Sequence, residues 1–110
     1  MTTIEILTKA RTFIEKGWIQ HSFAKDEFGR PVPVNSNLAV GWCAVGACHA
    51  AKGISEHEES ALENSGYLKL RDSLGLQRGE SISHWNDGAE RTQAVVLAAF
   101  DKAIASCPSS

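Results

Sequence analysis

The sequence predicts a mainly α fold, with four to five helices in a single globular helical domain over residues 1–110 and a small two-stranded β-ribbon after the first helix. Apolar residues recur at helical spacing in 3–16 and again in 88–105, as in amphipathic helices. The segment 37–52 is apolar almost all the way round and consists mostly of small residues, which is typical of a buried helix. Two prolines in 30–34 exclude a central strand there and leave room only for a short ribbon.

The composition is that of an ordinary globular protein, and it argues against some classes of function. The net charge is −2, from 11 Lys and Arg against 13 Asp and Glu, so no overall basic field favours nucleic acid. The cysteine count of 3 is odd, and the first residues lack the basic and apolar regions of a secretion signal. We therefore expect a cytoplasmic protein with reduced thiols and no membrane-spanning segment.

The first helix is expected over 3–16. Thr2 can cap its start, and Glu5 lies three residues further on, which is the spacing of a capping box. Gly17 then ends the helix. A turn over 26–29 follows, with Asp at its first position and Gly at its fourth. We expect this turn to join the two strands of the ribbon, 23–25 and 30–32, with Trp18 and Phe23 anchoring it on the helices.

The central helix is expected over about 37–52, between the first and last helices. A residue in 35–37 caps its start, and Gly53 ends it. Its bulky side chains form one stripe, Leu38, Trp42, Val45 and His49, and its small residues form another. Gly41 and Gly46 each cost about 1 kcal/mol in a helix interior. A neighbouring helix packed closely on the small stripe would offset that cost.

Shorter helices are expected in the second half of the chain. Ser55 and Glu58 have capping-box spacing and open an acidic helix that extends to about residue 64. Apolar residues at helical spacing predict another helix over 67–74, followed by a polar loop over 76–83. Asp87, with Glu90 three residues later, is expected to cap the last helix, 88–105.

Several short motifs together resemble a known family. They are Phe23-Ala24-Lys25-Asp26-x-x-Gly29-Arg30-Pro31-Val32, Trp42-Cys43-Ala44-x-Gly46-Ala47 and Trp85-Asn86-Asp87, with Gln20 before the first of them and Arg91-Thr92 after the last. The chain resembles a family of small bacterial and phage proteins known only as a domain of unknown function. The resemblance extends roughly from Ile4 to Ile104 and implies a common fold, but it implies no activity and no catalytic residues.

The turn before the last helix and the tip of the ribbon are the best candidates for a binding site. The residues that we predict to bind a partner are Trp85, Asn86, Asp87, Arg91, Phe28 and Arg30. Trp and Arg are over-represented at interaction hot spots. A purely structural interpretation of the turn is open as well, with Trp85 stapling the helix start and Asp87 capping it. Phe28 can either fold back onto Trp18 or project as a contact residue.

Cysteine and histidine chemistry in the central helix is disfavoured. Cys43 and Cys48 are five residues apart and diverge by about 140° around a helix, so they do not converge on one metal ion. A thiol in the middle of a buried helix is also a poor nucleophile. We therefore expect no metal, no cofactor and no catalytic residues, with the cysteines acting as small apolar core residues.

Three classes of function remain open. The first choice is a non-enzymatic interaction module that binds an unknown protein partner through the Trp85–Arg91 turn and the ribbon 25–30. The second is a small enzyme or metal-dependent protein that uses His84, Asp87, Cys43 or His49. The third is a nucleic-acid-binding accessory protein, and its local basic patch would consist of Lys25, Arg30, Arg71, Arg78 and Arg91.

Overall fold

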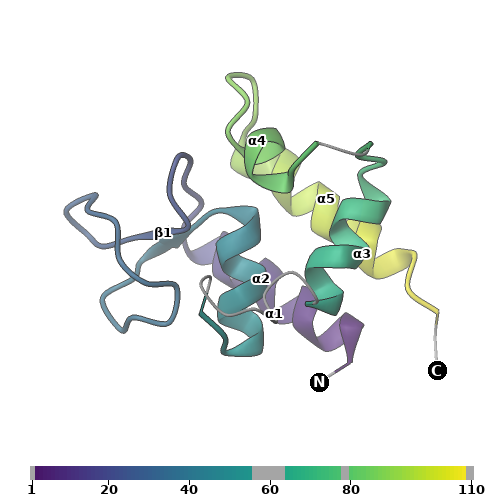
Figure 1. Ribbon diagram of the computed structural model, residues 1–110, viewed down its shortest axis with the longest axis horizontal. Helices are drawn as coiled ribbons and strands as arrows, with labels where there is room; N and C mark the ends of the chain where they lie inside the picture. Colours follow the sequence, from purple (N-terminus) through teal and green to yellow (C-terminus); the bar gives the residue numbers. More distant parts are fainter. Residues whose placement is uncertain (1, 56–63, 78–79, 109–110) are drawn as a thin grey trace.

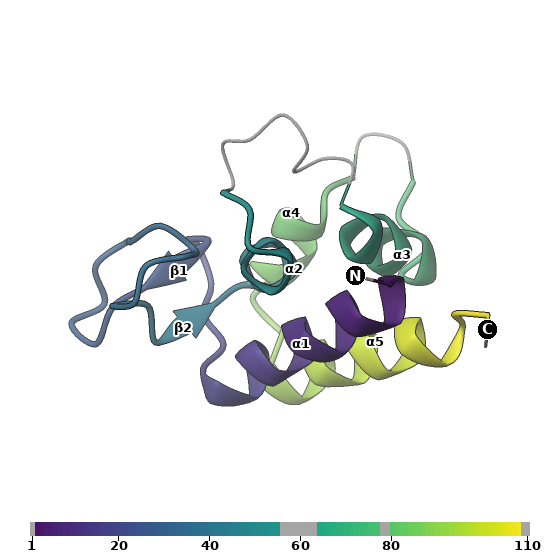
Figure 2. The same ribbon diagram turned by 90° about the horizontal axis from the view of Figure 1, so that it is seen from below.

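Two long helices lie side by side and form one layer of the molecule (Figure 2). The computed structural model describes residues 2–55, 64–77 and 80–108. Its helices are α1 (Thr3–Lys16), α2 (Ala44–Lys52), α3 (Ser65–Ser73), α4 (Ile82–Asn86) and α5 (Gln93–Ala105). Helices α1 and α5 form this layer, and α2, α3 and α4 all lie on one side of it. These elements pack into one compact globule with a Cα radius of gyration of 12.7 Å, which confirms the predicted mainly α fold.

Helix α1 has the predicted bounds, because both of its ends are determined by local sequence. The Thr2 hydroxyl accepts a hydrogen bond from the Glu5 amide at 3.1 Å, and the Glu5 carboxylate accepts one from the Thr2 amide at 3.0 Å. These reciprocal bonds form the expected capping box. The buried face of the helix consists of Ile6, Leu7, Ala10 and Ile14. At the other end, the helix stops at Gly17, whose backbone is extended.

The ribbon follows α1 and projects from the opposite end of the molecule to the start of α1 and the end of α5 (Figure 1). Strand β1 (Ala24–Lys25) pairs antiparallel with β2 (Gly41–Trp42). The predicted pairing with 30–32 is also present, but only as a bridge on the other edge of β1. There the Val32 amide donates to the Ala24 carbonyl at 3.1 Å. The strand that pairs with β1 is therefore β2, a distant segment that was predicted to belong to the central helix.

The central helix is shorter than predicted, since α2 begins at Ala44 and not near residue 37. The backbone amides of the preceding residues donate to the ribbon and to the end of α1. Val40 donates to the Lys25 carbonyl at 2.9 Å, and Trp42 donates to the Gly17 carbonyl at 2.9 Å. Strand pairing thus replaces the helical bonds that these amides would otherwise make. The prediction of a buried scaffold holds from residue 41 to residue 51, all of which are buried.

The neighbours of α2 also differ from those expected. Helix α2 packs on α1, α3 and α4, while α1 contacts both α2 and α5, so α1 and not α2 is the middle helix. The close approach predicted at Gly46 does occur, but the backbone at Phe23 makes it. A Cβ atom on Gly46 would lie 2.8 Å from the Phe23 carbonyl carbon and closer still to its oxygen. The glycine thus lets the segment before β1 lie directly on α2.

The turn before the last helix is not a helix start. Asp87 is the C-cap of α4, and the loop 88–92 separates it from α5. Thr92 caps α5 instead, and its hydroxyl accepts from the Val95 amide at 3.2 Å. The predicted cap at Asp87 was wrong because an equivalent Thr cap lies five residues further on.

The predicted helix over 67–74 is present as α3, which starts two residues earlier. Asn64 caps it, and its side-chain oxygen accepts from the Gly66 amide at 2.9 Å. The predicted polar loop 76–83 ends sooner than expected, because α4 begins at Ile82. The predicted acidic helix from Ser55 to about 64 falls on 56–63, outside the described residues. Within the described residues, no helix combines the length and the apolar composition that crossing a bilayer requires.

The turn at the ribbon tip should be sensitive to acid. One carboxylate oxygen of Asp26 accepts from the amides of Phe28 and Arg30, both at 2.9 Å, and the other accepts from the Arg30 Nε at 3.0 Å. Hydrogen bonding, first from the Arg30 amide, lowers the pKa of Asp26. Because the folded-state pKa lies below the unfolded value of about 3.9, this stabilisation is complete above that value. It disappears as the pH falls through the folded-state pKa.

We therefore expect the turn to stay ordered down to about pH 4 and to loosen below it. Amide NMR shifts of Phe28 and Arg30, followed against pH, measure this directly. An Asp26→Asn variant should have less order in this turn at neutral pH, because the amide weakens the pairing with the Arg30 guanidinium. Titration of Asp26 at or above about 3.9 would contradict the assignment.

Candidate functional site

Asn86 lies at the centre of the turn that the sequence analysis proposed as a binding site, and it is fully buried. Its side-chain oxygen accepts from the Trp18 indole N–H at 2.8 Å and from the Ala44 amide at 3.0 Å. Its side-chain nitrogen donates to the Ile19 carbonyl at 3.0 Å and to Asp87 Oδ1 at 3.1 Å. The amide of Asn86 therefore joins the end of α4 to the start of α2 and to the segment that follows α1.

The segment after α1 makes further bonds to the same turn. Gln20 donates through its side-chain nitrogen to the carbonyls of Asn86 and Gly88, at 3.0 and 2.9 Å. The backbone amide of His21 donates to Asp87 Oδ1 at 2.8 Å. His21 adopts a φ of 69°, which is uncommon for a residue other than glycine. The Trp-Asn-Asp motif thus forms an internal joint, and Gln20 and Ala44 of the other motifs contribute to it.

Trp85 and Arg91 contact each other. The Arg91 guanidinium carbon lies 4.4 Å from the centroid of the Trp85 ring, and Arg91 Nε donates to the Trp85 carbonyl at 2.8 Å. Both side chains are half-buried. A cation over an indole is a favourable contact within the protein itself. The Trp85 ring and carbonyl, the Asn86 side chain and the Arg91 Nε are therefore engaged within the protein, while Asp87 also faces a cavity.

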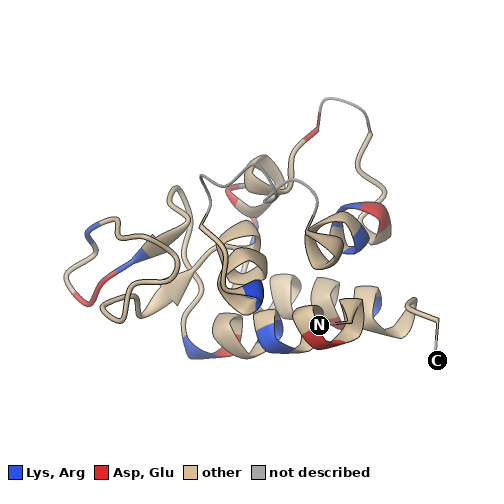
Figure 3. Cartoon of the chain, turned by 60° about the horizontal axis from the view of Figure 1, so that its bottom comes forward, with Lys and Arg blue, Asp and Glu red and all other residues tan. Residues whose placement is uncertain are grey.

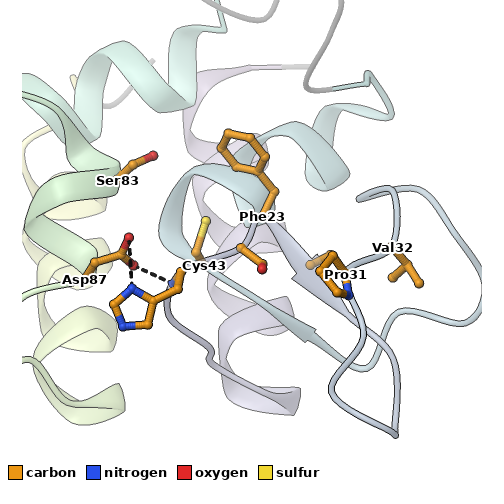
Figure 4. A pocket seen from close by; sticks show the side chains of 9 residues that line it. Phe23, Pro31, Val32, Cys43, Ser83 and Asp87 are labelled. Atoms are coloured by element: carbon orange, nitrogen blue, oxygen red, sulfur yellow. Dashed lines mark hydrogen bonds and ion pairs between the residues drawn. The ribbon is translucent and has the colours of Figure 1, made fainter.

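This cavity lies between the ribbon and α4, with a volume of about 320 Å³. The described residues that line it are His21, Ser22, Phe23, Ala24, Pro31, Val32, Cys43, Ser83 and Asp87. Figure 4 shows Ser83 and Asp87 on the α4 side and Phe23 on the opposite side, with the Cys43 sulfur between them. The cavity therefore combines apolar walls with a carboxylate at one side.

Cys43 lines the cavity, but its surroundings do not suit a nucleophile. It caps α2, and its sulfur accepts a hydrogen bond from the Gly46 amide at 3.3 Å. Burial, and to a lesser degree the charge of Asp87, raises the pKa of Cys43 to about 11. The thiolate fraction at pH 7 is then on the order of 10⁻⁴. Burial also raises the pKa of Cys48, which lies within the core.

The residues named for an enzyme or a metal site do not all meet. Cys43 and Asp87 line the same cavity, whereas His84 and His49 are absent from its described lining. His84 is exposed on α4, and His49 is buried on α2, beside Asn64. In the described part of the chain, no group of three or more His, Cys, Asp or Glu residues is arranged to hold a metal ion.

The ribbon carries an unusual concentration of exposed apolar side chains. We call Phe23, Phe28, Leu38 and Val40 the ribbon surface; their exposed fractions are 38, 72, 62 and 50%. Of the two possibilities for Phe28, the exposed one is observed. The Arg30 guanidinium carbon lies 5.0 Å from the centroid of the Phe28 ring, and Arg30 also pairs with Asp26. Phe28 and Arg30 thus project together from the ribbon tip.

The basic residues within 2–55, 64–77 and 80–108 do not gather into one field. Figure 3 shows Lys and Arg mixed with Asp and Glu in the ribbon, on α1 and on α3. Of the predicted patch, Lys25 and Arg30 lie in the ribbon, while Arg71 lies on α3 at the other end of the molecule. Arg78 falls outside the described residues. This dispersion gives little support to a continuous nucleic-acid interface.

His21, Ser83 and Phe23 line the cavity but were not predicted to line a site. Gln20 could have indicated these residues, because it accompanies the motifs and lies next to His21 in the sequence. Its side chain donates to the carbonyls of Asn86 and Gly88. If the motifs had been expected to pack against one another, His21 would have been predicted to lie near Asp87.

Comparison with known proteins identifies the family but no function. No curated protein and no solved structure gave a match. A model described as a family of unknown function, DUF6197, matches residues 1–106, almost the whole chain. The earlier resemblance to a domain of unknown function therefore leads to a defined family, and the chain belongs to DUF6197.

Proposed function

We propose that this protein is a non-enzymatic interaction module that binds a partner protein through the ribbon surface and the adjacent cavity. One observation carries the proposal. Among the described residues, the exposed large apolar side chains are Phe23, Phe28, Leu38, Val40, Leu68 and Val95. Four of these six lie within the short stretch 23–40, on an element that projects from the helices. Concentrated exposed apolar groups beside polar ones are typical of protein-binding surfaces.

The predicted binding residues divide into two groups under this proposal. Phe28 and Arg30 lie at the ribbon tip, and Asp87 lines the cavity, so these three belong to the proposed surface. Asn86 supports it from inside, because its bonds hold α4 beside the segment that leads into the ribbon. Arg91 and Trp85 contact each other at the same turn. The three free cysteines are compatible with the reducing cytoplasm that we expect.

Capture from a lysate of the source organism tests the proposal. The double variant Phe28→Ser/Leu38→Ser removes the two most exposed apolar side chains of the ribbon surface. We expect this variant to fold. The amount of specific partner that it captures should fall by about tenfold or more, as for the loss of hot-spot contacts. The matched control is Leu68→Ser/Val95→Ser, which removes exposed apolar side chains from α3 and α5.

The control should retain the partner at the wild-type level, as measured by quantitative mass spectrometry. Equal capture by the wild type and both double variants would refute the ribbon surface. The absence of any specific partner would also count against an interaction module.

A further inference from the structure

We propose that the cavity between the ribbon and α4 receives a Lys or Arg side chain of the partner protein. This inference rests on the proposed function, because the ribbon surface would bring the partner to the mouth of the cavity. It adds a chemical class of ligand and a residue, Asp87, that selects it.

Asp87 supplies the counter-charge. Its Oδ1 already accepts bonds from the His21 amide and from Asn86, so the carboxylate has a fixed orientation. Among the described residues no donor makes a hydrogen bond to Oδ2, and the His21 Nδ1 lies 3.8 Å from it. This distance exceeds that of a hydrogen bond, so Oδ2 can accept a cationic donor. The Asp87 side chain is 31% exposed, so a ligand can reach it from the cavity.

The opposite wall suits the alkyl stem of such a side chain. Phe23, Pro31 and Val32 line it, across the cavity from Ser83 and Asp87 (Figure 4). Lys and Arg bury their methylene groups along apolar surface while the charged head finds a polar partner. An aromatic wall adds an attraction for the cation.

The size and charge of the cavity agree with this occupant. A volume of about 320 Å³ lies at the lower end of the range for ligand sites and accommodates a long side chain. Among the described lining residues there is no Lys or Arg, and the basic side chain beside Asp87, His21, is a cation only when it is protonated. The cavity borders the ribbon surface through Phe23, which belongs to both. A polypeptide with a basic residue next to an apolar one would therefore contact both at once.

A titration with a matched pair of probes tests the inference. N-acetyl-arginine amide is the cationic probe, and N-acetyl-citrulline amide is its neutral counterpart of nearly the same shape. Amide NMR spectra of the full chain are recorded with each probe. We expect the arginine probe to shift the amides of His21, Phe23, Ser83 and Asp87, with far smaller shifts from the citrulline probe.

Two variants locate the effect. Asp87→Asn should weaken binding of the arginine probe by about five- to tenfold, the loss of one half-buried charge pair. Ser83→Lys, a change in the cavity lining, should abolish binding by placing a cation there, and it decides the matter if Asp87→Asn does not fold. Glu27→Gln is the control, because Glu27 is an exposed ribbon carboxylate outside the described cavity lining. Its affinity should equal that of the wild type.

Equal binding of both probes, or shifts that persist in Ser83→Lys, would overturn the inference. So would the absence of shifts at the cavity. Each of these results would leave the ribbon surface intact, because lysate capture with the Phe28→Ser/Leu38→Ser variant tests that surface separately.

Discussion

Replacement of Gly46 by alanine is expected to lower the free energy of unfolding by about 3 kcal/mol. The added Cβ would lie 2.8 Å from the Phe23 carbonyl carbon, and nearer to its oxygen. Both are backbone atoms, so no side-chain rotation relieves the overlap. The strain also reaches the Cys43 amide, which donates to the same Phe23 carbonyl at 3.1 Å. The substitution would therefore push the ribbon away from α2.

Chemical denaturation followed by circular dichroism measures this effect. Gly88→Ala is the matched control, since a Cβ there would lie 3.4 Å from its nearest neighbour, the Trp85 carbonyl oxygen. We expect that control to change the stability by less than about 1 kcal/mol. Similar losses in both variants would show that general glycine effects, and not the contact with Phe23, determine the result.

Replacement of Asn86 by alanine is expected to cost about 3–4 kcal/mol. The variant removes an acceptor from the Trp18 indole and from the Ala44 amide, and it removes a donor from the Ile19 carbonyl. Buried polar groups that lose their partners carry the full cost of desolvation. The truncated side chain also leaves a void in a fully buried position.

The same denaturation experiment checks this value, with Asn37→Ala as the control at an exposed loop position. The control should be within about 0.5 kcal/mol of the wild type. In the Asn86→Ala variant, the indole N–H resonance of Trp18 should also move, because its acceptor is gone. A loss of less than about 1 kcal/mol with an unmoved indole resonance would contradict the role of Asn86 as an internal joint.

Features encoded by local sequence were predictable. Helix α1 has its expected bounds because the Thr2–Glu5 capping box and Gly17 lie within or beside it. The ribbon tip was predictable for the same reason, since Asp26 bonds the amides of the next few residues.

Features that depend on distant partners were not predictable. The stretch 37–43 has the composition of a buried helix, yet Val40, Trp42 and Cys43 donate to the ribbon and to the end of α1. Helix periodicity contains no information about these partners. The prediction for Gly46 was partly correct. A close backbone approach was expected there, but from a neighbouring helix and not from the backbone of Phe23.

The candidate site shows the same division. The Trp85-Asn86-Asp87 motif predicted a site in the correct part of the chain. The role of Asn86, however, depends on its bond with Trp18, which is 68 residues away in the sequence. Only the fold reveals that Asn86 is buried and that Asp87 faces a cavity shared with the ribbon. Asp87 therefore keeps a place in the proposed surface, whereas Asn86 acts inside the protein.

The central claim is that the partner binds at the ribbon and the cavity, while the turn at Asn86 serves the fold. Amide hydrogen exchange of the protein, with and without the partner retained in the capture experiment, tests it most directly. We predict that binding adds protection over 21–32 and 36–40, with little change over 93–105. New protection over α1 and α5, with the ribbon unchanged, would contradict the claim.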